Sequence, residues 1–409
     1  MTTTALTESP HDTLTRLAEW QSGLREQFPI ITGNPGLVYL DSSATAQKPR
    51  PVLDAVHHYL TTTNANAGRG TYEWANRTTE LMDIGRDTVR RFLGDAGDGP
   101  STVTFVDGTS TGLRRVAMDW LMSELRDGDE IIVPFADHQA NNAPWLEASA
   151  ELARRGTHIV VHALPYEQSG SGDYDIDALA QLVTPRTRFV AVTHVHHVYG
   201  NDMNVHRIRR VCGPDIVICL DAAQSVGHMP VDVGAVDVDF VVFSGHKAMA
   251  LPGIGAIWAR NTRGEAFAPH GWSGSPNTSG VVSVITALGW LSDAGLREIH
   301  DWTVSLGAVV TDALAGCESY ELLGCQESLT LESRVQRRQG IVTFRHRQVS
   351  ANDLGFVLAG AGFMVRADGH CQAGDRGTES SVRVSVHAYN TLDEVDRLIT
   401  VLRDLDSAR

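Results

Sequence analysis

Two charged residues in the sequence follow buried apolar runs, and either could do chemistry. Lys247 ends the run in FVVFSGHKAMALPGIG, between two groups of small residues. Asp221 ends the run IVICLD and is followed by the small residues AAQS. Because an unpaired buried charge is costly, a direct salt bridge between Asp221 and Lys247 would explain both residues. A reactive amine that faces a carboxylate across a bound group would explain them equally well.

Hydroxyl groups cluster near these two residues and suggest an anion site. In VDGTSTGL, Thr109 and Ser110 follow an apolar run and begin an amphipathic segment. Hydroxyls and backbone amides at the start of a helix suit a phosphate dianion, although Ser and Thr are also ordinary helix caps. Ser244 and His246 stand directly before Lys247, and GWSGSPNTSG adds further glycines and hydroxyls.

His138 follows the run IIVPFAD, where its ring could lie flat against a planar cofactor. A single histidine at such a place is more often only hydrogen-bonded. Here it accompanies an amine, a carboxylate and a phosphate-type loop. These features are what pyridoxal phosphate requires: an amine for the Schiff base, a carboxylate for the pyridine nitrogen, an aromatic cover and an anion cradle. The residues therefore predict a pyridoxal phosphate site.

Apolar runs that alternate with helix-length amphipathic segments indicate how these side chains are positioned. The runs are STVTFVDGTST, DEIIVPFADH, THIVVHALP, TRFVAVTHV, DIVICLDAAQ, VDFVVFSGHK and GIGAIWAR. Such alternation favours an α/β fold in which a mainly parallel seven-stranded sheet has helices on both faces. Ligands of open parallel sheets bind at the carboxyl ends of the strands. We therefore expect the candidate residues to meet at that edge.

The pattern changes along the chain and predicts three parts. Residues 1–36 are mostly polar with one amphipathic patch, which is typical of an arm that packs on the rest and, here, with the small domain. Residues 37–280 contain the seven runs and should form a large cofactor-binding domain. From residue 281 longer helical stretches precede isolated strands such as GIVTFRH and SSVRVSVHAY. Residues 281–409 should therefore form a smaller α+β domain.

Composition limits the partners of the protein. The chain has 409 residues, 42% of them hydrophobic, and a net charge of -15, which argues against nucleic acid and anionic membranes and for a small-molecule substrate. No apolar run approaches the roughly 18 residues of a membrane span. The N-terminus has no signal-peptide pattern, so we expect a cytoplasmic protein. We expect no metal site, and an odd set of cysteines without a CxxC pair is typical of buried thiols in a reducing compartment. These are Cys212, Cys219, Cys317, Cys325 and Cys371.

LDAAQSVGHMPVDV followed by VDFVVFSGHKAMALPGIGAIW closely resembles the class V aminotransferase family, and most closely its SufS-type (group II) cysteine desulfurases. The similarity extends through YLDSSATAQKP, DHQANNAPW, VTHVHHVYG, SPNTSG and RVSVHAYNTLDEVDRL, and covers the chain from about Leu37. It implies a pyridoxal-phosphate-dependent transferase of fold type I. It also implies a homodimer with each active site at the subunit interface.

The resemblance implies a role for each candidate. Lys247 would bind the cofactor as a Schiff base and later move a proton at the substrate Cα. Asp221 would pair with the pyridine nitrogen, Gln224 would donate to the phenolic oxygen, and the His138 ring would stack on the cofactor. Arg383 would bind the substrate carboxylate through a bidentate pair. The phosphate would be held by Thr109, Ser110, Ser244 and His246, with Ser275 reaching in from the other subunit.

Two further positions concern the substrate and the fate of its sulfur. Cys371, in VRADGHCQAG, lies where SufS-type enzymes keep their persulfide cysteine, and the adjacent His370 could favour its thiolate. A bystander thiol on a mobile loop is the alternative. Position 190, which is Val190 in the run TRFVAVTHV, is a substrate-site candidate of unknown role.

The chain also departs from the SufS-type pattern. His197 stands where the family has an asparagine beside the cofactor, and Gly68 stands where it has a histidine. The segment between Lys247 and SPNTSG and the loop after Cys371 are both shorter than in SufS-type enzymes. Removal of bulk at the entrance should admit a larger substrate.

These departures favour an enzyme that acts on L-cysteine S-conjugates. It would form a Cα carbanion and cleave the carbon–sulfur bond by β-elimination, in antibiotic biosynthesis such as the lincosamide pathways. The principal alternative is a SufS-like cysteine desulfurase that gives alanine and a persulfide on Cys371, with or without a sulfur-acceptor protein. Because His197 could change which Cα bond breaks, decarboxylation and oxidative deamination also stay open. A non-catalytic scaffold would have little reason to keep all the cofactor residues.

Overall fold

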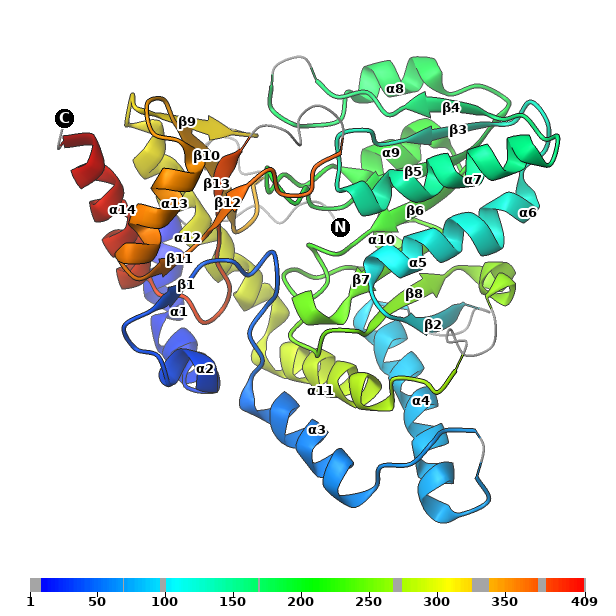
Figure 1. Cartoon of the computed structure of the whole chain (residues 1–409), viewed down its shortest axis with the longest axis horizontal. Helices are drawn as coiled ribbons and strands as arrows, with labels where there is room; N and C mark the ends of the chain where they lie inside the picture. The colour runs from blue at the N-terminus through cyan, green and yellow to red at the C-terminus, as the bar shows by residue number, and fades with distance from the viewer. Residues whose placement is uncertain are drawn as a thin grey trace.

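The computed structural model describes residues 9–68, 70–95, 101–167, 170–267, 274–325, 338–373 and 380–407. A large and a small β-sheet lie side by side, each covered by helices (Figure 1). A third, two-stranded parallel sheet pairs β1 (Val38–Tyr39) with β11 (Phe363–Met364). A segment near the N-terminus therefore lies against the C-terminal part of the chain.

The large sheet has seven strands in the order β2-β8-β7-β6-β5-β3-β4. All pairs from β7 to β4 are parallel, whereas β8 is antiparallel to both β7 and β2. The prediction of a mainly parallel seven-stranded sheet is confirmed, and each of the seven apolar runs forms one strand. The strands are β2 (Thr102–Val106), β3 (Glu130–Val133), β4 (Val160–Ala163), β5 (Thr187–Thr193), β6 (Val217–Asp221), β7 (Phe240–Ser244) and β8 (Gly255–Ala259).

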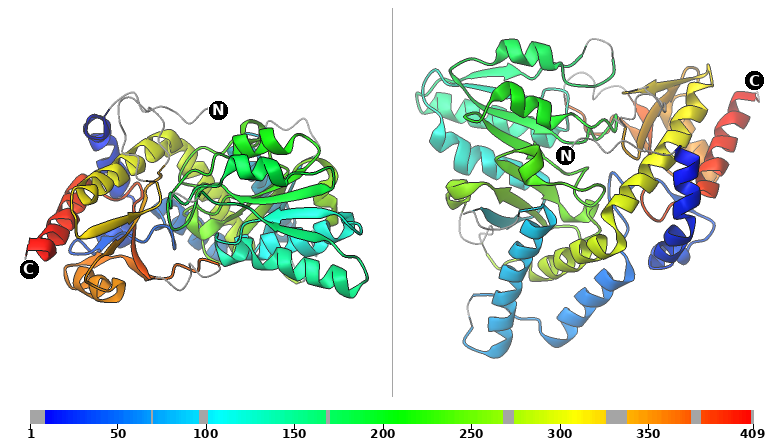
Figure 2. Two further views of the ribbon diagram at one scale, coloured as in Figure 1. Left: turned by 90° about the horizontal axis from the view of Figure 1, so that it is seen from above. Right: turned by 180° about the vertical axis from the view of Figure 1, so that it is seen from behind.

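Helices cover both faces of this sheet (Figure 2). Alternate side chains of one strand enter opposite cores: Val241 packs in one hydrophobic cluster and Val242 in the other. Continuous apolar runs are therefore needed, as expected for parallel strands buried on both sides. One face carries α5 (Thr109–Arg115), a π-helical turn (Val116–Leu121), α6 (Met122–Glu124) and α7 (Ala143–Arg154). The other carries α4 (Glu73–Phe92), α8 (Ile176–Leu182), α9 (Val205–Cys212), α10 (Val233–Val236) and α11 (Thr278–Ala294), with α3 (Arg50–Thr62) beside α11.

The small sheet is antiparallel, in the order β12 (Arg366–Asp368), β13 (Ser381–Ser385), β10 (Ile341–His346), β9 (Tyr320–Leu323). Its core also takes in side chains from the N-terminal segment: Leu14 and Leu17 of α1 are buried with Trp302 of α12. Figure 2 shows α1 lying along α12. The helices are α1 (Pro10–Arg25), α12 (Leu296–Ala315), α13 (Ala351–Gly360) and α14 (Leu392–Ser407), and the short α2 (Pro29–Thr32) follows α1.

The helices α11 and α12 lead from the large sheet to the small one. Val281 of α11 belongs to the core of the large sheet, and Leu306 of α12 belongs to that of the small sheet. The domain limits 37–280 and 281–409 stay a prediction. No single helix in the described ranges has the length and hydropathy to span a membrane; α11 and α12 pass that test only together, across a bend of 77°.

Gly85 permits the close packing of α4 on β2 and α11. A Cβ atom at this position would lie 2.6 Å from Val281 Cγ1 and 2.9 Å from Phe105 Cζ. Gly85→Ala should therefore lower the free energy of unfolding by about 1–3 kcal/mol, because overpacking displaces these side chains. Urea denaturation measures the change. At Gly23 in α1, an added Cβ atom would meet no other atom within 4 Å. Gly23→Ala should therefore raise the free energy of unfolding by about 0.5–1 kcal/mol. Shifts of the same sign in both variants would contradict the packing argument.

Candidate active site

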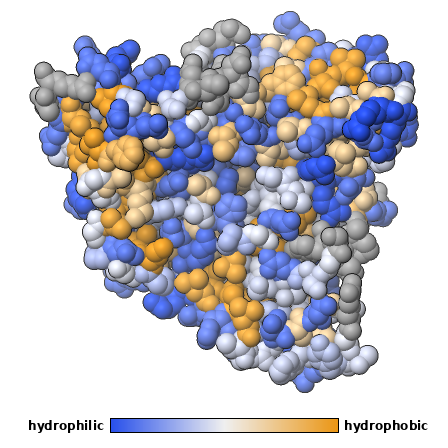
Figure 3. Space-filling model, viewed as in Figure 1, coloured by the Kyte–Doolittle hydropathy of each residue, from blue (hydrophilic) through white to orange (hydrophobic). Residues whose placement is uncertain are grey.

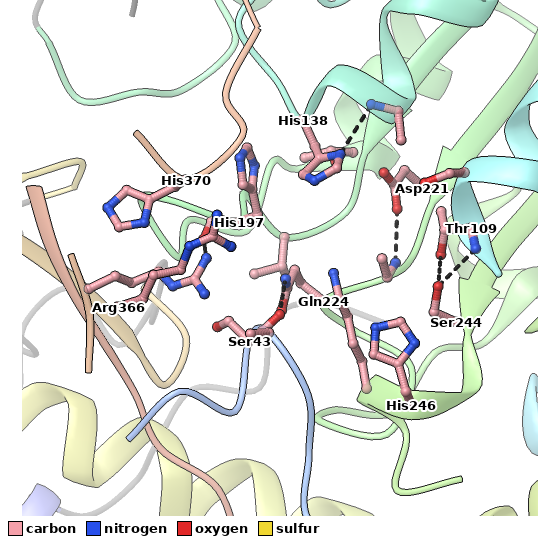
Figure 4. A pocket seen from close by; sticks show the side chains of 18 residues that line it. Ser43, Thr109, His138, His197, Asp221, Gln224, Ser244, His246, Arg366 and His370 are labelled. Atoms are coloured by element: carbon pink, nitrogen blue, oxygen red, sulfur yellow. Dashed lines mark hydrogen bonds between the residues drawn. The ribbon is translucent and has the colours of Figure 1, made fainter. Parts of the chain in front are cut away.

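A pocket opens at the carboxyl ends of β5, β6 and β7, on the side that faces the small sheet (Figure 4). Arg366 of the small sheet, which sequence reasoning did not assign to the site, also lines it, as does His370, which the sequence analysis named only as a neighbour of Cys371. Arg366 begins β12, which is only three residues long, and His370 lies in the turn that follows it, so no hydrophobic pattern marks either residue. The sequence-predicted residues that line the pocket are Thr109, Ser110, His138, His197, Asp221, Gln224, Ser244, His246, Lys247 and Arg383.

One end of the pocket is built from hydroxyl groups. Ser244 ends β7, and its Oγ lies 2.8 Å from the backbone N of Thr109 and 2.7 Å from Thr109 Oγ1. Glycine allows this approach, since a Cβ at Gly255 would lie 2.8 Å from the Cα of Gly108. His246 is adjacent, and burial together with the charge of Lys247 lowers its pKa to about 4. The hydroxyls, the Thr109 amide and a neutral imidazole therefore suit an anion.

Lys247 lies in the 3-10 turn Gly245–Lys247, which directly follows β7. Burial lowers the pKa of Lys247 to about 8, although the carboxylate of Asp221 opposes this shift. Burial likewise raises the pKa of Asp221, and Lys247 opposes that shift in turn. Asp221 Oδ1 accepts from the backbone N of Ala223 at 2.9 Å (Figure 4). No direct ion pair joins Asp221 and Lys247, so the salt-bridge interpretation of the two residues is wrong.

Two neutral imidazoles stand above this pair. His138 Nδ1 accepts from the backbone N of Ala140 at 3.1 Å, which places the ring proton on Nε2. Burial and Lys247 lower the pKa of His138 to about 4. His197 meets the His138 ring edge to face, with ring centroids 5.0 Å apart. Burial holds the pKa of His197 well below its usual value, and its Nε2 is buried without a hydrogen-bond partner.

Further unsatisfied polar atoms mark the places where a bound group is expected. Gln224 Nε2 donates to the carbonyl oxygen of Ser43 at 3.0 Å, but its Oε1 is buried without a partner. Arg383 is 1% exposed, and its Nε also lacks a partner. Its two terminal nitrogens donate to His197 O and Asp41 Oδ1, each at 3.0 Å. Because buried polar groups are normally satisfied, these atoms indicate missing ligand atoms.

Three sequence-predicted residues lie outside the pocket lining. Cys371 is exposed, and its Sγ accepts from Arg366 Nη2 at 3.3 Å. Ser275 is exposed, and its predicted role needs a second subunit, so that role stays a prediction. Val190 is 0% exposed within the core of the large sheet. Position 190 is therefore wrong as a substrate contact.

The residues present fit pyridoxal phosphate. A buried amine with a lowered pKa faces a buried carboxylate that lacks a cation, and opposite charge from a protonated ring nitrogen would stabilise that carboxylate. The neutral ring of His138 can cover a planar cofactor. The Thr109 and Ser244 hydroxyls lie at the end of the pocket where a phosphate would reach (Figure 4). Lys247 would hold the cofactor covalently, and Asp221 would set the charge of its ring.

Cofactor binding should depend on pH through the amine of Lys247. Only the neutral amine attacks an aldehyde, so the rate at which added pyridoxal phosphate binds the cofactor-free protein should rise with pH and level off above about 8. The appearance of the visible absorption band measures this rate. Asp221→Asn removes the negative charge that raises the pKa of Lys247. The midpoint of the pH dependence of this binding rate should therefore move to lower pH.

The other lysine of the chain provides a matched control. Burial also lowers the pKa of Lys48 to about 8, but Lys48 lies outside the pocket lining. Lys48→Ala should keep the absorption band, whereas Lys247→Ala should lose it. A band that survives in Lys247→Ala would show that Lys247 is not the point of attachment.

Comparison with known proteins identifies relatives of this arrangement. The family model "Aminotransferase class-V" matches residues 38–275 and 266–398. A probable cysteine desulfurase of Vibrio cholerae is 31% identical over 93% of this chain and 96% of the relative. The cysteine desulfurase CsdA of Escherichia coli is 30% identical over 92% of this chain and 96% of the relative.

Solved structures agree with this result. The apo cysteine desulfurase of Thermococcus onnurineus has a TM-score of 0.83 at 25% identity, over 95% of this chain and 98% of that one. The Escherichia coli CsdA structure has a TM-score of 0.78 at 29% identity, over 94% and 98%. The prediction that this chain has the fold of pyridoxal-phosphate-dependent enzymes is thereby confirmed. The chain belongs to the class V aminotransferase family and is a pyridoxal-phosphate-dependent, cysteine desulfurase-like enzyme.

Proposed function

We propose that this enzyme is a cysteine desulfurase that takes the sulfur of free L-cysteine onto Cys371. The observation that carries the proposal is the contact between Arg366 and Cys371. Arg366 lines the pocket, and its Nη2 lies 3.3 Å from the Cys371 Sγ. A single guanidinium therefore touches both the reaction space and the thiol, so the thiol stands at the rim of the pocket. Similarity to cysteine desulfurases over more than nine-tenths of the chain supports the same reaction.

The residues of the pocket can divide the work of such a reaction. When bound, pyridoxal phosphate supplies an electron sink for a carbanion at the substrate Cα. Arg383 holds the substrate carboxylate, because its buried Nε is unsatisfied and it presents a planar fork. Lys247 moves the proton at Cα, because an amine with a pKa of about 8 is partly neutral near pH 7.

Sulfur transfer is then a nucleophilic step of Cys371. Its thiolate attacks the substrate sulfur, an S–S bond forms, and the Cβ–S bond breaks. The electron pair of that bond stays on the carbon side, which takes up protons and leaves as alanine. Cys371 keeps the sulfur as a persulfide until a reductant or an acceptor thiol removes it. Exposure of Cys371 is consistent with this last step.

A second function is favoured by His197. Its buried, unpartnered Nε2 adjoins the stacking histidine, at a position where the SufS-type pattern has a neutral amide. A neutral imidazole there, with its proton on Nε2, can donate a hydrogen bond to a departing thiolate and so stabilise its charge. This supports β-elimination from an S-substituted L-cysteine, with pyruvate, ammonia and a thiol as products and no part for Cys371. A place in antibiotic biosynthesis stays a prediction.

Products from wild-type enzyme and Cys371→Ala separate the two functions. For a desulfurase, the wild type should release alanine and sulfide from L-cysteine when a reductant is present. In Cys371→Ala the rate of this release should fall by more than about tenfold, because the nucleophile is gone. Cys317→Ala is the matched control, since the half-buried Cys317 thiol bonds Ala313 O outside the pocket.

Other products would exclude the desulfurase. Pyruvate and ethanethiol from S-ethyl-L-cysteine, at equal rates in the wild type and in Cys371→Ala, would establish the elimination. Release of carbon dioxide would indicate decarboxylation instead.

We also propose that the protein is a homodimer, as its family resemblance implies. The exposed large apolar side chains on and beside α3 and α4 are Leu53, Leu60, Tyr72, Trp74 and Ile84, which are 40–56% exposed. Figure 3 shows hydrophobic surface in the lower part of the molecule, where Figure 1 places α3 and α11. Such a cluster is typical of an interface. A second subunit seated there would also allow Ser275 to act across the interface.

Sedimentation of two charged variants tests the dimer. Leu60→Glu combined with Trp74→Glu should convert a dimer to a monomer, because a dry interface would then have to bury two carboxylates from each subunit. Phe356→Glu, at a side chain that is 78% exposed on α13, should leave the mass of the dimer unchanged. A wild-type protein that sediments as a monomer at micromolar concentration would contradict the proposal.

A further inference from the structure

Asp368, at the end of β12, is the centre of a small polar cluster beside the pocket. Its Oδ1 and Oδ2 lie 2.9 and 3.0 Å from Arg366 Nε. The same Oδ1 accepts from the backbone N of His370 at 2.6 Å and lies 3.1 Å from His370 Nδ1. One carboxylate therefore contacts a guanidinium, a backbone amide and an imidazole.

Arg366 connects this carboxylate to the thiol. Its guanidinium binds Asp368 through Nε, and its Nη2 lies 3.3 Å from Cys371 Sγ. Because a guanidinium is planar and rigid, fixing its Nε edge also fixes the direction of Nη2. Figure 4 shows Arg366 entering the pocket beside His370. Cys371 thus meets a donor whose direction is set by Asp368.

The backbone of the loop depends on the same carboxylate. His370 and Cys371 have φ of 55° and 58°, a region that non-glycine residues seldom occupy. The bond from the His370 amide to Asp368 holds the first of these residues as an Asx turn does. The carbonyl of Cys371 accepts from the backbone N of Gln139 at 3.1 Å, so the second is held by the large domain. His370 Nε2 lies 2.9 Å from Ser381 Oγ and fixes the ring.

We propose that Asp368 is a positioning residue, which aims Arg366 at Cys371 and so keeps the Cys371 thiolate available as a nucleophile. The use of this arrangement in sulfur transfer rests on the proposed function, whereas the contacts among Asp368, Arg366 and Cys371 do not depend on it. Asp368 acts through Arg366 and touches neither substrate nor cofactor. If Asp368 acted only through its charge, it would repel a thiolate at Cys371, and its removal should make Cys371 more reactive. If Asp368 positions Arg366, its removal should make Cys371 less reactive.

Charged groups near this cluster come from both domains. Arg366 and Asp368 lie on β12, and Arg383 lies on the neighbouring β13 in register with Arg366. Lys247 lies in the large domain, and its pKa is lowered by burial and also by the charges of Arg383 and Arg366. Burial lowers the pKa of His370 to about 3 and that of His138 to about 4, so both rings are neutral near pH 7.

Alkylation of the holoenzyme by iodoacetamide at pH 7.5 tests the proposal, with mass spectrometry to quantify the Cys371 peptide. The reagent reacts with the thiolate. Asp368→Ala should slow the alkylation of Cys371 by about fivefold, which is the loss of one typical hydrogen bond. Asp368→Asn, which keeps an acceptor oxygen for Arg366 and for the His370 amide, should keep more than half of the wild-type rate.

Further variants keep the test decisive. Arg366→Lys keeps the positive charge but loses the planar fork, so it should also slow the alkylation of Cys371 by about fivefold. This variant tests the proposal independently, should Asp368→Ala fail to fold. Glu321→Gln removes a carboxylate from β9, at the opposite edge of the small sheet, and should have no effect. The visible absorption band confirms that each variant folds and binds its cofactor.

Three results would overturn the proposal: faster or unchanged alkylation in Asp368→Ala, equal losses in Asp368→Ala and Asp368→Asn, or a wild-type rate in Arg366→Lys. The alkylation does not depend on turnover. If Cys371→Ala kept full desulfurase activity while Asp368→Ala slowed the alkylation, the proposed function would fail and the positioning role would stand.

Discussion

The short connection between β7 and β8 is the constraint on which the active site depends. A parallel pair needs a crossover of about a dozen residues or more, and residues 245–254 are too few. The chain must therefore turn back at once, and β8 runs antiparallel to β7. Lys247 lies in this tight turn and cannot move away from the sheet edge. The amine group lines the pocket, where it is buried close to the carboxylate of Asp221.

Burial of this amine against Asp221 gives the pocket its electrostatic character. Burial lowers the pKa values of the neighbouring His138 and His246, and the charge of Lys247 lowers them further. The rings near the amine are consequently neutral, and positive charge is supplied by Lys247 and by the arginines of the small sheet. A site of this kind attracts an anionic, planar ligand with a carboxylate. Its polar groups stay unsatisfied until such a ligand arrives, as the free Oε1 of Gln224 shows.

The small sheet completes the site by contacts that are distant in sequence. Asp41 lies next to Ser385 in an isolated parallel bridge and pairs with Arg383. Arg338 is 5% exposed and donates to the carbonyls of Tyr199 and Leu323, which belong to opposite sides of the boundary between the sheets. These interactions fix Arg383 and Arg366 relative to Lys247. The positions of substrate and thiol thus depend on how the two sheets pack.

The large sheet and most of the residues at the cofactor site could be predicted from the amino-acid sequence. Strands buried on both faces need continuous apolar runs, and the residues that end such runs must meet at one edge, so Asp221, Ser244 and Lys247 could be placed from the sequence. The sequence did not reveal that Arg366 and His370 line the pocket, because Arg366 lies on the very short β12 and His370 in the turn after it, and neither segment has a periodic pattern. These positions, and the cluster of Asp368, Arg366 and Cys371, became known from the three-dimensional packing. Strand ends follow from the local hydrophobic pattern, whereas the approach of the small sheet follows from packing between segments that are distant in sequence.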